Sequence, residues 1–120
     1  MKVLKVLMVD DDLEQLSIRT LVFEKNDFKV VTASDGKGAL QLAAEHKPNH
    51  VLMDLNVPTH ADGLALIRDL KAMDGNMRLF ILTGSDLRRF RQLPEAKLVD
   101  GVFGKPASSA ALIRKLKSYD

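Results

Sequence analysis

Side chains that bind phosphate and metal ions recur at four points in the chain, each at or just beyond the end of a run of apolar residues. Three consecutive aspartates, Asp10–Asp12, follow the first run. Asp54 follows another run, and Thr83 and Lys105 come after two later ones. Carboxylates that are held close together repel one another, and one of them would have to protonate unless a cation is present. A bound divalent cation resolves this conflict.

Phosphoryl transfer assisted by Mg²⁺ is the chemistry that suits this set of residue types. Mg²⁺ prefers oxygen ligands, uses one or two carboxylates, keeps several waters and accepts phosphate oxygens as further ligands. A nucleophilic carboxylate beside Mg²⁺, with an ammonium and a hydroxyl to bind the equatorial oxygens of the phosphoryl group, makes a phosphoryl-transfer site. Gly84 follows Thr83 and has no side chain to obstruct the approach. We therefore expect Mg²⁺ as the cofactor.

The elements that must position these residues alternate regularly along the chain. Short continuous apolar runs predict strands, and apolar residues at helical spacing predict the helices between them. Continuous apolar strands indicate a parallel sheet covered on both faces, and the pattern predicts a doubly wound α/β fold with five strands. Ligands in such folds bind beyond the carboxyl ends of the strands, where the polar residues stand. The predicted strands are 3–9, 28–32, 50–53, 79–82 and 99–103, and the predicted helices are 13–25, 36–46, 64–73, 87–93 and 108–118.

Composition narrows the class of protein further. The 120 residues fit one domain, 1–120, and the apolar share of 46% with 28% charged residues is that of an ordinary globular protein. No apolar run is long enough to span a bilayer, and the start of the chain lacks the pattern of a signal peptide, so we expect a cytoplasmic protein. The absence of cysteine excludes disulfides, thiol catalysis and cysteine-ligated zinc.

Charge is distributed unevenly although the net charge is only +2. Acidic residues gather near the start of the chain and basic residues near its end. Basic patches can bind nucleic acid, but no aromatic residues are interleaved with them to stack on bases, so we do not expect nucleic acid as a partner of this domain. The basic residues are Arg88, Arg89, Arg91, Arg114, Lys115 and Lys117.

Over nearly its whole length the chain resembles a receiver domain of the response-regulator family, such as the single-domain chemotaxis regulator. No single matching segment is specific, but several in the right order, in a β/α chain of this length, are. The resemblance implies a (βα)5 flavodoxin-like fold. The matching segments are Val9–Asp12, Leu52–Asp54 with Pro58 four residues on, Asp62–Leu64, Ile81–Gly84 and Gly104–Pro106.

The resemblance implies a metal site and a phosphate site. Asp11 would bind Mg²⁺ directly, Asp10 directly or through water, and the carbonyl of Asn56 would complete the protein ligands together with Asp54. Asp54 would also accept the phosphoryl group. A sensor histidine kinase or a histidine phosphotransfer protein would supply that group.

Two further residues would hold the phosphoryl group. Thr83 would bond one of its oxygens, and Lys105 would contact both the phosphate and Asp54. The Lys105–Pro106 bond is expected to be cis, as in the family. The domain would catalyse its own phosphorylation and dephosphorylation, and would act mainly as a signalling switch. Its output would pass through the surface of the fourth helix, fifth strand and fifth helix to a downstream partner or output domain.

The sequence departs from the family pattern at the expected switch residue. Val102 occupies the place of the usual aromatic, and Phe103, one position later, should face the other side of the strand. The shift between states should therefore be smaller than is usual for the family. The predicted loop from Asp54 to Gly63, which contains Pro58, is one residue longer than usual, and Pro94 shortens the fourth helix. With its three arginines, the fourth helix predicts an acidic partner.

Several polar residues have simpler interpretations. Asp12 is expected to cap the first helix rather than bind metal, and Ser108 or Ser109 is expected to cap the last helix. Ser85 and Asp86 are expected to cap the fourth helix, although Ser85 is placed to contact an attacking water. His60 is expected to be an exposed loop histidine.

Three other functions compete with a phosphoacceptor. A receiver-like domain that docks on a partner without phosphorylation remains the alternative. An aspartate-nucleophile phosphatase of the haloacid-dehalogenase type would share the Asp10 and Asp12 spacing, but Leu13–Glu14 replaces the expected Gly-Thr. A flavodoxin-like electron carrier would need a hydroxyl-rich phosphate loop where the aspartates stand. The sequence does not distinguish a stand-alone regulator from an excised domain.

Overall fold

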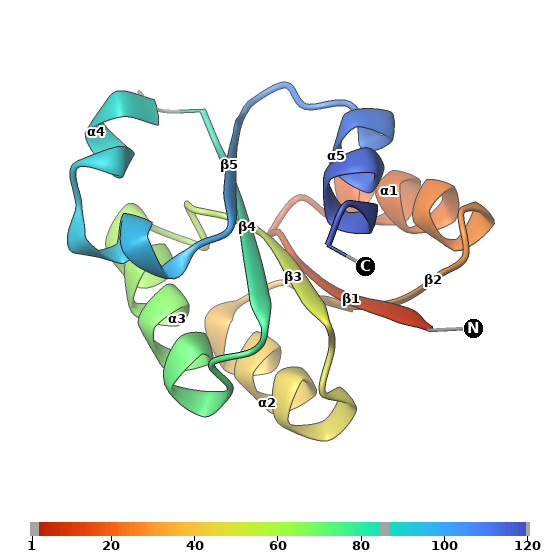
Figure 1. Cartoon of the computed structure of the whole chain (residues 1–120), viewed down its shortest axis with the longest axis horizontal. Coiled ribbons are helices and arrows are strands. Elements are labelled where there is room, and N and C mark those ends of the chain that lie inside the picture. The colour runs from red at the N-terminus through yellow and green to blue at the C-terminus, as the bar shows by residue number, and fades with distance from the viewer. Residues whose placement is uncertain (1–2, 85–86, 120) are drawn as a thin grey trace.

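The computed structural model describes residues 3–84 and 87–119. Five parallel strands form one sheet in the order β2-β1-β3-β4-β5, as Figure 1 shows. The order reverses between β1 and β3, which makes that pair the switch point of a doubly wound sheet. The predicted fold class is confirmed. The strands are β1 (Leu4–Val9), β2 (Phe28–Ala33), β3 (His50–Asp54), β4 (Arg78–Thr83) and β5 (Gly101–Gly104).

Helices cover both faces of the sheet, so the molecule has three layers (Figure 1). Helices α1 (Leu13–Lys25) and α5 (Ser109–Lys117) pack on one face. The other face carries α2 (Gly36–His46), α3 (His60–Met73), the short helix α4 (Leu87–Arg91) and the 3-10 helix η1 (Pro94–Leu98).

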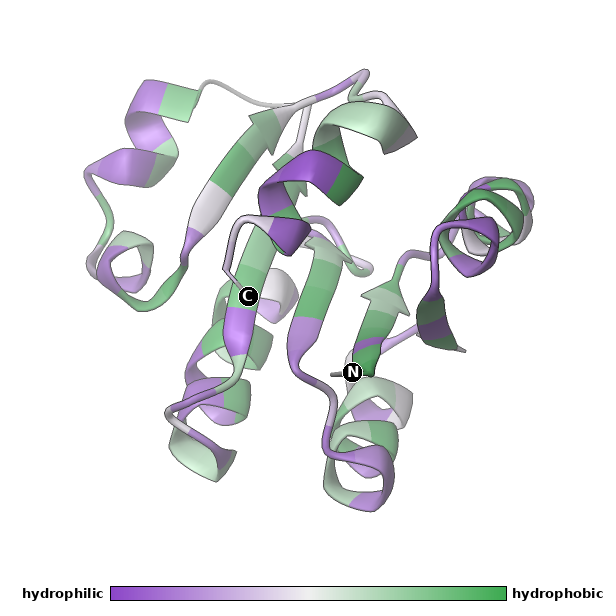
Figure 2. Cartoon of the chain, turned by 45° about the vertical axis from the view of Figure 1, so that its right-hand side comes forward, coloured by the Kyte–Doolittle hydropathy of each residue, from purple (hydrophilic) through white to green (hydrophobic). Residues whose placement is uncertain are grey.

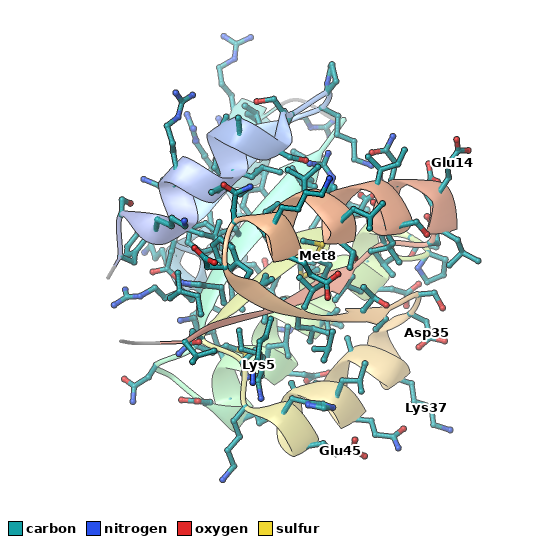
Figure 3. The ribbon with its side chains drawn as sticks, turned by 90° about the vertical axis from the view of Figure 1, so that its right-hand side faces the viewer. Lys5, Met8, Glu14, Asp35, Lys37 and Glu45 are labelled. Atoms are coloured by element: carbon teal, nitrogen blue, oxygen red, sulfur yellow. The ribbon has the colours of Figure 1, made fainter. Side chains whose placement is uncertain are left out.

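Two apolar cores fill the spaces between the layers, and Figure 2 shows the apolar strands enclosed by helices. Successive residues of a strand point to opposite faces. Leu7 accordingly packs toward α2 and α3, whereas Met8 packs toward α1 and α5. Met8 lies beneath α1 in Figure 3, while Lys37 and Glu45 project outward from α2. Burial on both faces explains why the strands read as continuous apolar runs.

Helix α3 begins at His60, four residues before the predicted start at Leu64. Thr59 caps it, because its side-chain oxygen accepts a hydrogen bond from the N–H of Asp62 at 3.2 Å. Gly63 suggested a loop, but it lies inside the helix. A Cβ at this position would lie 1.7 Å from the carbonyl oxygen of Leu55, so the glycine allows the close approach of α3 to the chain after β3.

The region between β4 and β5 also differs from the prediction. Helix α4 ends at Arg91 rather than 93, and the 3-10 helix that starts at Pro94 was not predicted. Strand β5 starts at Gly101, not at Val99, because Val99 is the capping residue that directly follows η1. Val102 and Phe103 face opposite sides of the sheet, as predicted: Val102 packs with the α2 and α3 core and Phe103 with the α1 and α5 core.

Two predicted caps are confirmed. The Asp12 carboxylate accepts a hydrogen bond from the N–H of Gln15 at 3.1 Å, and the Ser108 hydroxyl accepts one from Ala111 at 3.1 Å. The predicted cap at Ser85 and Asp86 lies outside the described residues. The Lys105–Pro106 bond is cis as predicted, and so is Val57–Pro58.

Tyr119 joins the last turn of the described chain to the sheet. Its ring packs edge-on against Phe80 with 5.6 Å between centroids, and its hydroxyl donates to the carbonyl of Asp100 at 3.1 Å. The guanidinium of Arg78 lies 4.6 Å from the ring centroid. Separately, no helix within the described ranges is long and apolar enough to cross a bilayer.

Candidate functional site

Strand register brings the predicted site residues to one edge of the sheet. Val9 pairs with Met53 across β1 and β3, so Asp10 and Asp54 follow at the same level. Asp54 pairs with Leu82 in β4, which places Thr83 one step beyond. Thr83 pairs in turn with Gly104, and Lys105 follows. The parallel sheet thus gathers side chains from four strands at its carboxyl edge.

Three carboxylates form a cluster at this edge. One oxygen from each of Asp10, Asp11 and Asp54 lies within 4.8 Å of the other two. Asp10 and Asp54 are only 7% and 5% exposed, whereas Asp11 is exposed. Ligands on opposite sides of an octahedral Mg²⁺ lie about 4 Å apart, so the spacing of these three oxygens is close to that of ligands that share one ion. The donor set is all oxygen and suits Mg²⁺.

Backbone N–H groups fix the two buried carboxylates. The N–H of Asp12 donates to Asp10 Oδ1 at 2.9 Å, and the N–H of Asn56 donates to Asp54 Oδ1 at 3.0 Å. Each is a local turn in which a carboxylate binds the backbone two residues on. The backbone of Asn56 is therefore held close to Asp54, where a further metal ligand is expected. Ligation of a metal by the Asn56 carbonyl stays a prediction.

Lys105 supplies the one basic partner seen for Asp54 in the described structure. Its Nζ donates to Asp54 Oδ2 and forms an ion pair with it. One ammonium thus faces three carboxylates. Burial raises the pKa of the Asp10 carboxyl above its ordinary value, the N–H of Asp12 opposes this shift, and the charge of Asp54 adds to it. The site carries more negative charge than its protein groups balance, which favours a bound cation.

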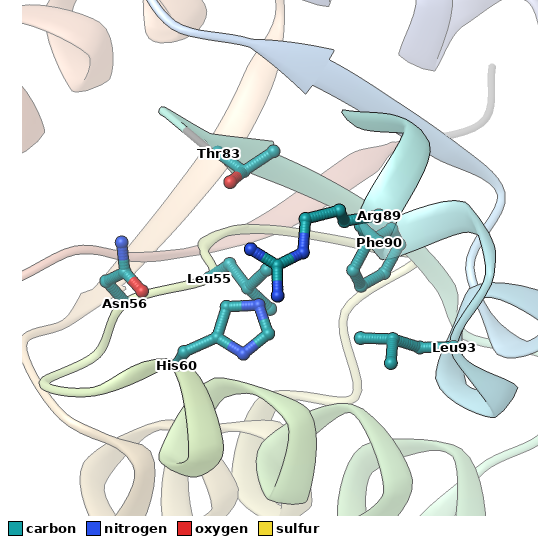
Figure 4. Close-up of a pocket in the computed structure, with 7 residues that line it drawn as sticks. All are labelled: Leu55, Asn56, His60, Thr83, Arg89, Phe90 and Leu93. Atoms are coloured by element: carbon teal, nitrogen blue, oxygen red, sulfur yellow. The ribbon is translucent and has the colours of Figure 1, made fainter. Parts of the chain in front are cut away.

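Thr83 is the last residue of β4 and is 1% exposed. Its carbonyl accepts a hydrogen bond from the N–H of Lys105 at 2.9 Å, which ties the end of β4 to the loop after β5. Thr83 also lines a hollow together with Asn56 and His60 (Figure 4). His60 is exposed as predicted, but it is the first residue of α3 and not part of a loop.

Arg19 is a site neighbour that sequence reasoning missed. It lies on α1 between the buried Leu16 and Phe23, and it lines a cavity with Asp10 and Lys105. Its Nη2 donates to the carbonyl of Ala107 at 3.1 Å, whereas its Nε and Nη1 are buried without a hydrogen-bond partner in the described part of the chain. Burial lowers the pKa of this guanidinium, and the charge of Asp10 opposes the shift. The sequence signal that could have identified Arg19 is its helical spacing from the core residues Leu16 and Phe23.

Fold and site together define a doubly wound α/β domain with a buried aspartate, a lysine and an acidic cluster at the carboxyl edge of its sheet. Comparison with known families agrees: the model of the response regulator receiver domain matches residues 6–117. The chain belongs to this family, the receiver domains of two-component response regulators.

Individual relatives are similar over nearly the whole chain. The transcriptional regulatory protein PrrA of Mycobacterium tuberculosis is 31% identical over 114 residues, which cover 95% of this chain and 48% of PrrA. The chain thus spans about half the length of these curated relatives.

Solved structures show the same fold. A CheY-like receiver domain from Methylobacillus flagellatus is 25% identical with a TM-score of 0.84, over 99% of this chain and 100% of that one. A response regulator from Burkholderia pseudomallei, solved with a phosphorylated aspartic acid and a calcium ion, is 25% identical with a TM-score of 0.83, over 94% of this chain and 66% of that one.

Proposed function

We propose that this receiver domain accepts a phosphoryl group on Asp54 in a Mg²⁺-dependent reaction. The observation that carries the proposal is the position of the buried Asp54 carboxylate, which lies beside the acidic pair Asp10 and Asp11 and forms an ion pair with Lys105. The similar Burkholderia pseudomallei protein was solved with a phosphorylated aspartic acid and a calcium ion, which supports both parts of the proposal.

Four residues would hold the metal in this proposal: Asp10, Asp11, Asp54 and the carbonyl of Asn56. When bound, Mg²⁺ supplies positive charge that offsets the carboxylates and the incoming phosphate oxygens. Burial raises the pKa of the Asp10 carboxyl and so disfavours its ionised form. A cation bound beside Asp10 would favour the ionised form and offset this effect.

The chain's own residues would do the rest. Asp54 is the nucleophile, and the N–H of Asn56 holds its Oδ1 so that the carboxylate keeps one orientation. The ammonium of Lys105 already donates to Oδ2, and it would contact the phosphoryl oxygens as the new bond forms. Thr83, at the end of the neighbouring strand, would donate its hydroxyl proton to a further oxygen.

The phosphoryl donor in the cell would be a histidine kinase or a histidine phosphotransfer protein, and the exchange would take place in the cytoplasm. The output would pass through α4, β5 and α5 to a downstream protein or output domain, since PrrA is named a transcriptional regulatory protein and is about twice as long. Arg88, Arg89 and Arg91 on α4 would attract an acidic partner in a salt-sensitive way. With Val102 in place of an aromatic, the change in this surface should be small.

Intact-mass measurement with a small phosphodonor and Mg²⁺ tests the proposal. Wild type should gain one phosphoryl group and Asp54→Asn should gain none. Mg²⁺ titration followed by amide shifts should perturb residues 10–12 and 54–56, and Asp11→Ala should abolish that response. Equal labelling of wild type and Asp54→Asn would refute the assignment. No labelling of either would favour a module that binds partners without phosphorylation.

A further inference from the structure

We infer that the hollow beside Thr83 is a subsite for the carboxylate of a small acyl-phosphate donor, with the Arg89 guanidinium as its cation and His60 as a second polar group. The inference rests on the proposed function, because it assigns a place to the group that leaves when Asp54 is phosphorylated. Neither residue belongs to the metal and phosphate set described above.

The hollow is formed where residues 55–60 meet Thr83 and residues 89–93. Its volume is about 370 Å³, within the range of small-molecule sites. The chain after β3, the end of β4 and the α4 region each contribute walls (Figure 4). The lining residues are Leu55, Asn56, His60, Thr83, Arg89, Phe90 and Leu93.

The hollow adjoins the phosphoryl acceptor. Leu55 and Asn56 follow Asp54 directly, and the N–H of Asn56 is bonded to its carboxylate. Thr83 stands one step beyond the residue that pairs with Asp54. The acidic cluster and Lys105 do not line this hollow, whereas Asn56, whose carbonyl is proposed to bind the metal, does. A group lying in the hollow would therefore border the metal and phosphate site without displacing its charged residues.

Charge and polarity in the hollow fit a short carboxylate. The guanidinium of Arg89 and the imidazole of His60 point into the same space from opposite walls (Figure 4). Glu95 interacts electrostatically with His60, but its carboxylate is paired with Arg68 and so does not cancel the charge of Arg89. Leu55, Phe90 and Leu93 give an apolar wall on which a short alkyl group can lie.

The reaction at this position needs no proton and no further reactant. A carboxylate oxygen of Asp54 attacks phosphorus, and the bond between phosphorus and the acyl oxygen breaks. The electron pair leaves on that oxygen, so the products are phosphorylated Asp54 and a free carboxylate. Negative charge therefore develops on the acyl oxygen in the transition state, where the Arg89 guanidinium would stabilise it.

Two donors with the same phosphoryl group and different leaving groups test the inference. Acetyl phosphate releases a carboxylate, whereas phosphoramidate releases neutral ammonia. Arg89→Gln should slow labelling of Asp54 by acetyl phosphate about fivefold, as expected for one partly exposed ion pair, and by phosphoramidate less than about twofold. Arg91→Gln is the matched control: it removes the same charge from the same exposed helix but lies outside the hollow. Sodium acetate alone should shift the amide signals of His60 and Thr83 in wild type and not in Arg89→Gln.

Each result separates this inference from the proposed function. Donor-dependent slowing in Arg89→Gln alone supports the subsite. If Arg89→Gln and Arg91→Gln slow both donors equally, the arginines act only through the general field of the surface and the subsite is refuted, although Asp54 remains the acceptor. If neither donor labels wild type, the proposed function fails and the subsite falls with it.

Discussion

Replacing Gly63 with alanine is the sharpest test of how α3 sets the geometry beside Asp54. The added Cβ would lie 1.7 Å from the carbonyl oxygen of Leu55 and 2.7 Å from its carbonyl carbon. Both contacts are to backbone, so no side chain can rotate away. Relief requires α3 and the chain after β3 to separate by about 1.5 Å to reach an ordinary close contact.

The cost follows from what α3 buries. Its inner face carries Leu66, Ile67 and Leu70, which are at most 3% exposed and belong to the core shared with α2. Moving the helix outward loosens this packing. Overpacked cores lose about 1–3 kcal/mol, and a backbone obstruction belongs at the upper end, so we expect a loss of about 3 kcal/mol. For a domain of this size that corresponds to a melting temperature about 10 °C lower.

Thermal and urea unfolding followed by circular dichroism would measure the loss. Gly75→Ala is the control, because nothing lies within 4 Å of a Cβ at Gly75, and it should change the free energy of unfolding by less than about 0.5 kcal/mol. Because Leu55 is bonded directly to Asp54, Gly63→Ala should also slow phosphoryl labelling. If Gly63→Ala melts within about 2 °C of wild type, the contact between α3 and Leu55 yields easily and the argument for this glycine is wrong.

Two further predictions concern the charges at the site. Because burial raises the pKa of Asp10, the metal-free fold is favoured when Asp10 is protonated, and stability is lost as the pH rises above 3.8 and through the folded-state pKa. Asp10→Asn should therefore stabilise the metal-free domain at pH 7 by about 1 kcal/mol and flatten its pH dependence, and urea unfolding from pH 4 to 8 that shows parallel curves would contradict this. Arg19→Met should leave stability unchanged or raise it by up to about 1 kcal/mol, because two buried nitrogens without hydrogen-bond partners in the described chain disappear. Phosphoryl labelling of Asp54 should still slow in Arg19→Met, because the hydrogen bond to Ala107 that anchors the loop after Lys105 is lost. A marked drop in melting temperature would show that this hydrogen bond outweighs the cost of the buried donors.

The sequence allowed the sheet and its polar edge to be predicted because strands buried on both faces are continuous apolar runs with visible ends. The ends of these runs mark Asp54 and Thr83 as residues at strand ends without any knowledge of the helices. The structure shows that the two strands are neighbours. Helix α3 was predicted to start too late because Gly63 has two physical uses, a turn or a close approach, and only the position of Leu55 distinguishes them. Val99 was wrongly given to β5, since an apolar residue at the end of a 3-10 helix looks the same as one in a strand.

Other parts of the site depend on distances that no local pattern contains. The contact between Arg19 and Ala107 joins residues 88 positions apart. The hollow at Thr83 likewise requires that His60 and Arg89, from α3 and α4, meet over one strand end. Each of these residues looks alone like an ordinary member of a helix surface.

Tyr119 has a practical consequence for following the domain in solution. The chain contains one tyrosine and no tryptophan, so its intrinsic fluorescence excited near 280 nm comes almost entirely from this single ring. The ring packs edge-on against Phe80 of β4 and lies near the cations of Arg78 and Lys115. Its emission therefore reports on one corner of the molecule, where the last turn of the described chain meets the sheet. A shift of α5 would change the quenching of that ring, so the unmodified protein carries its own optical reporter of the surface that is proposed to transmit the signal.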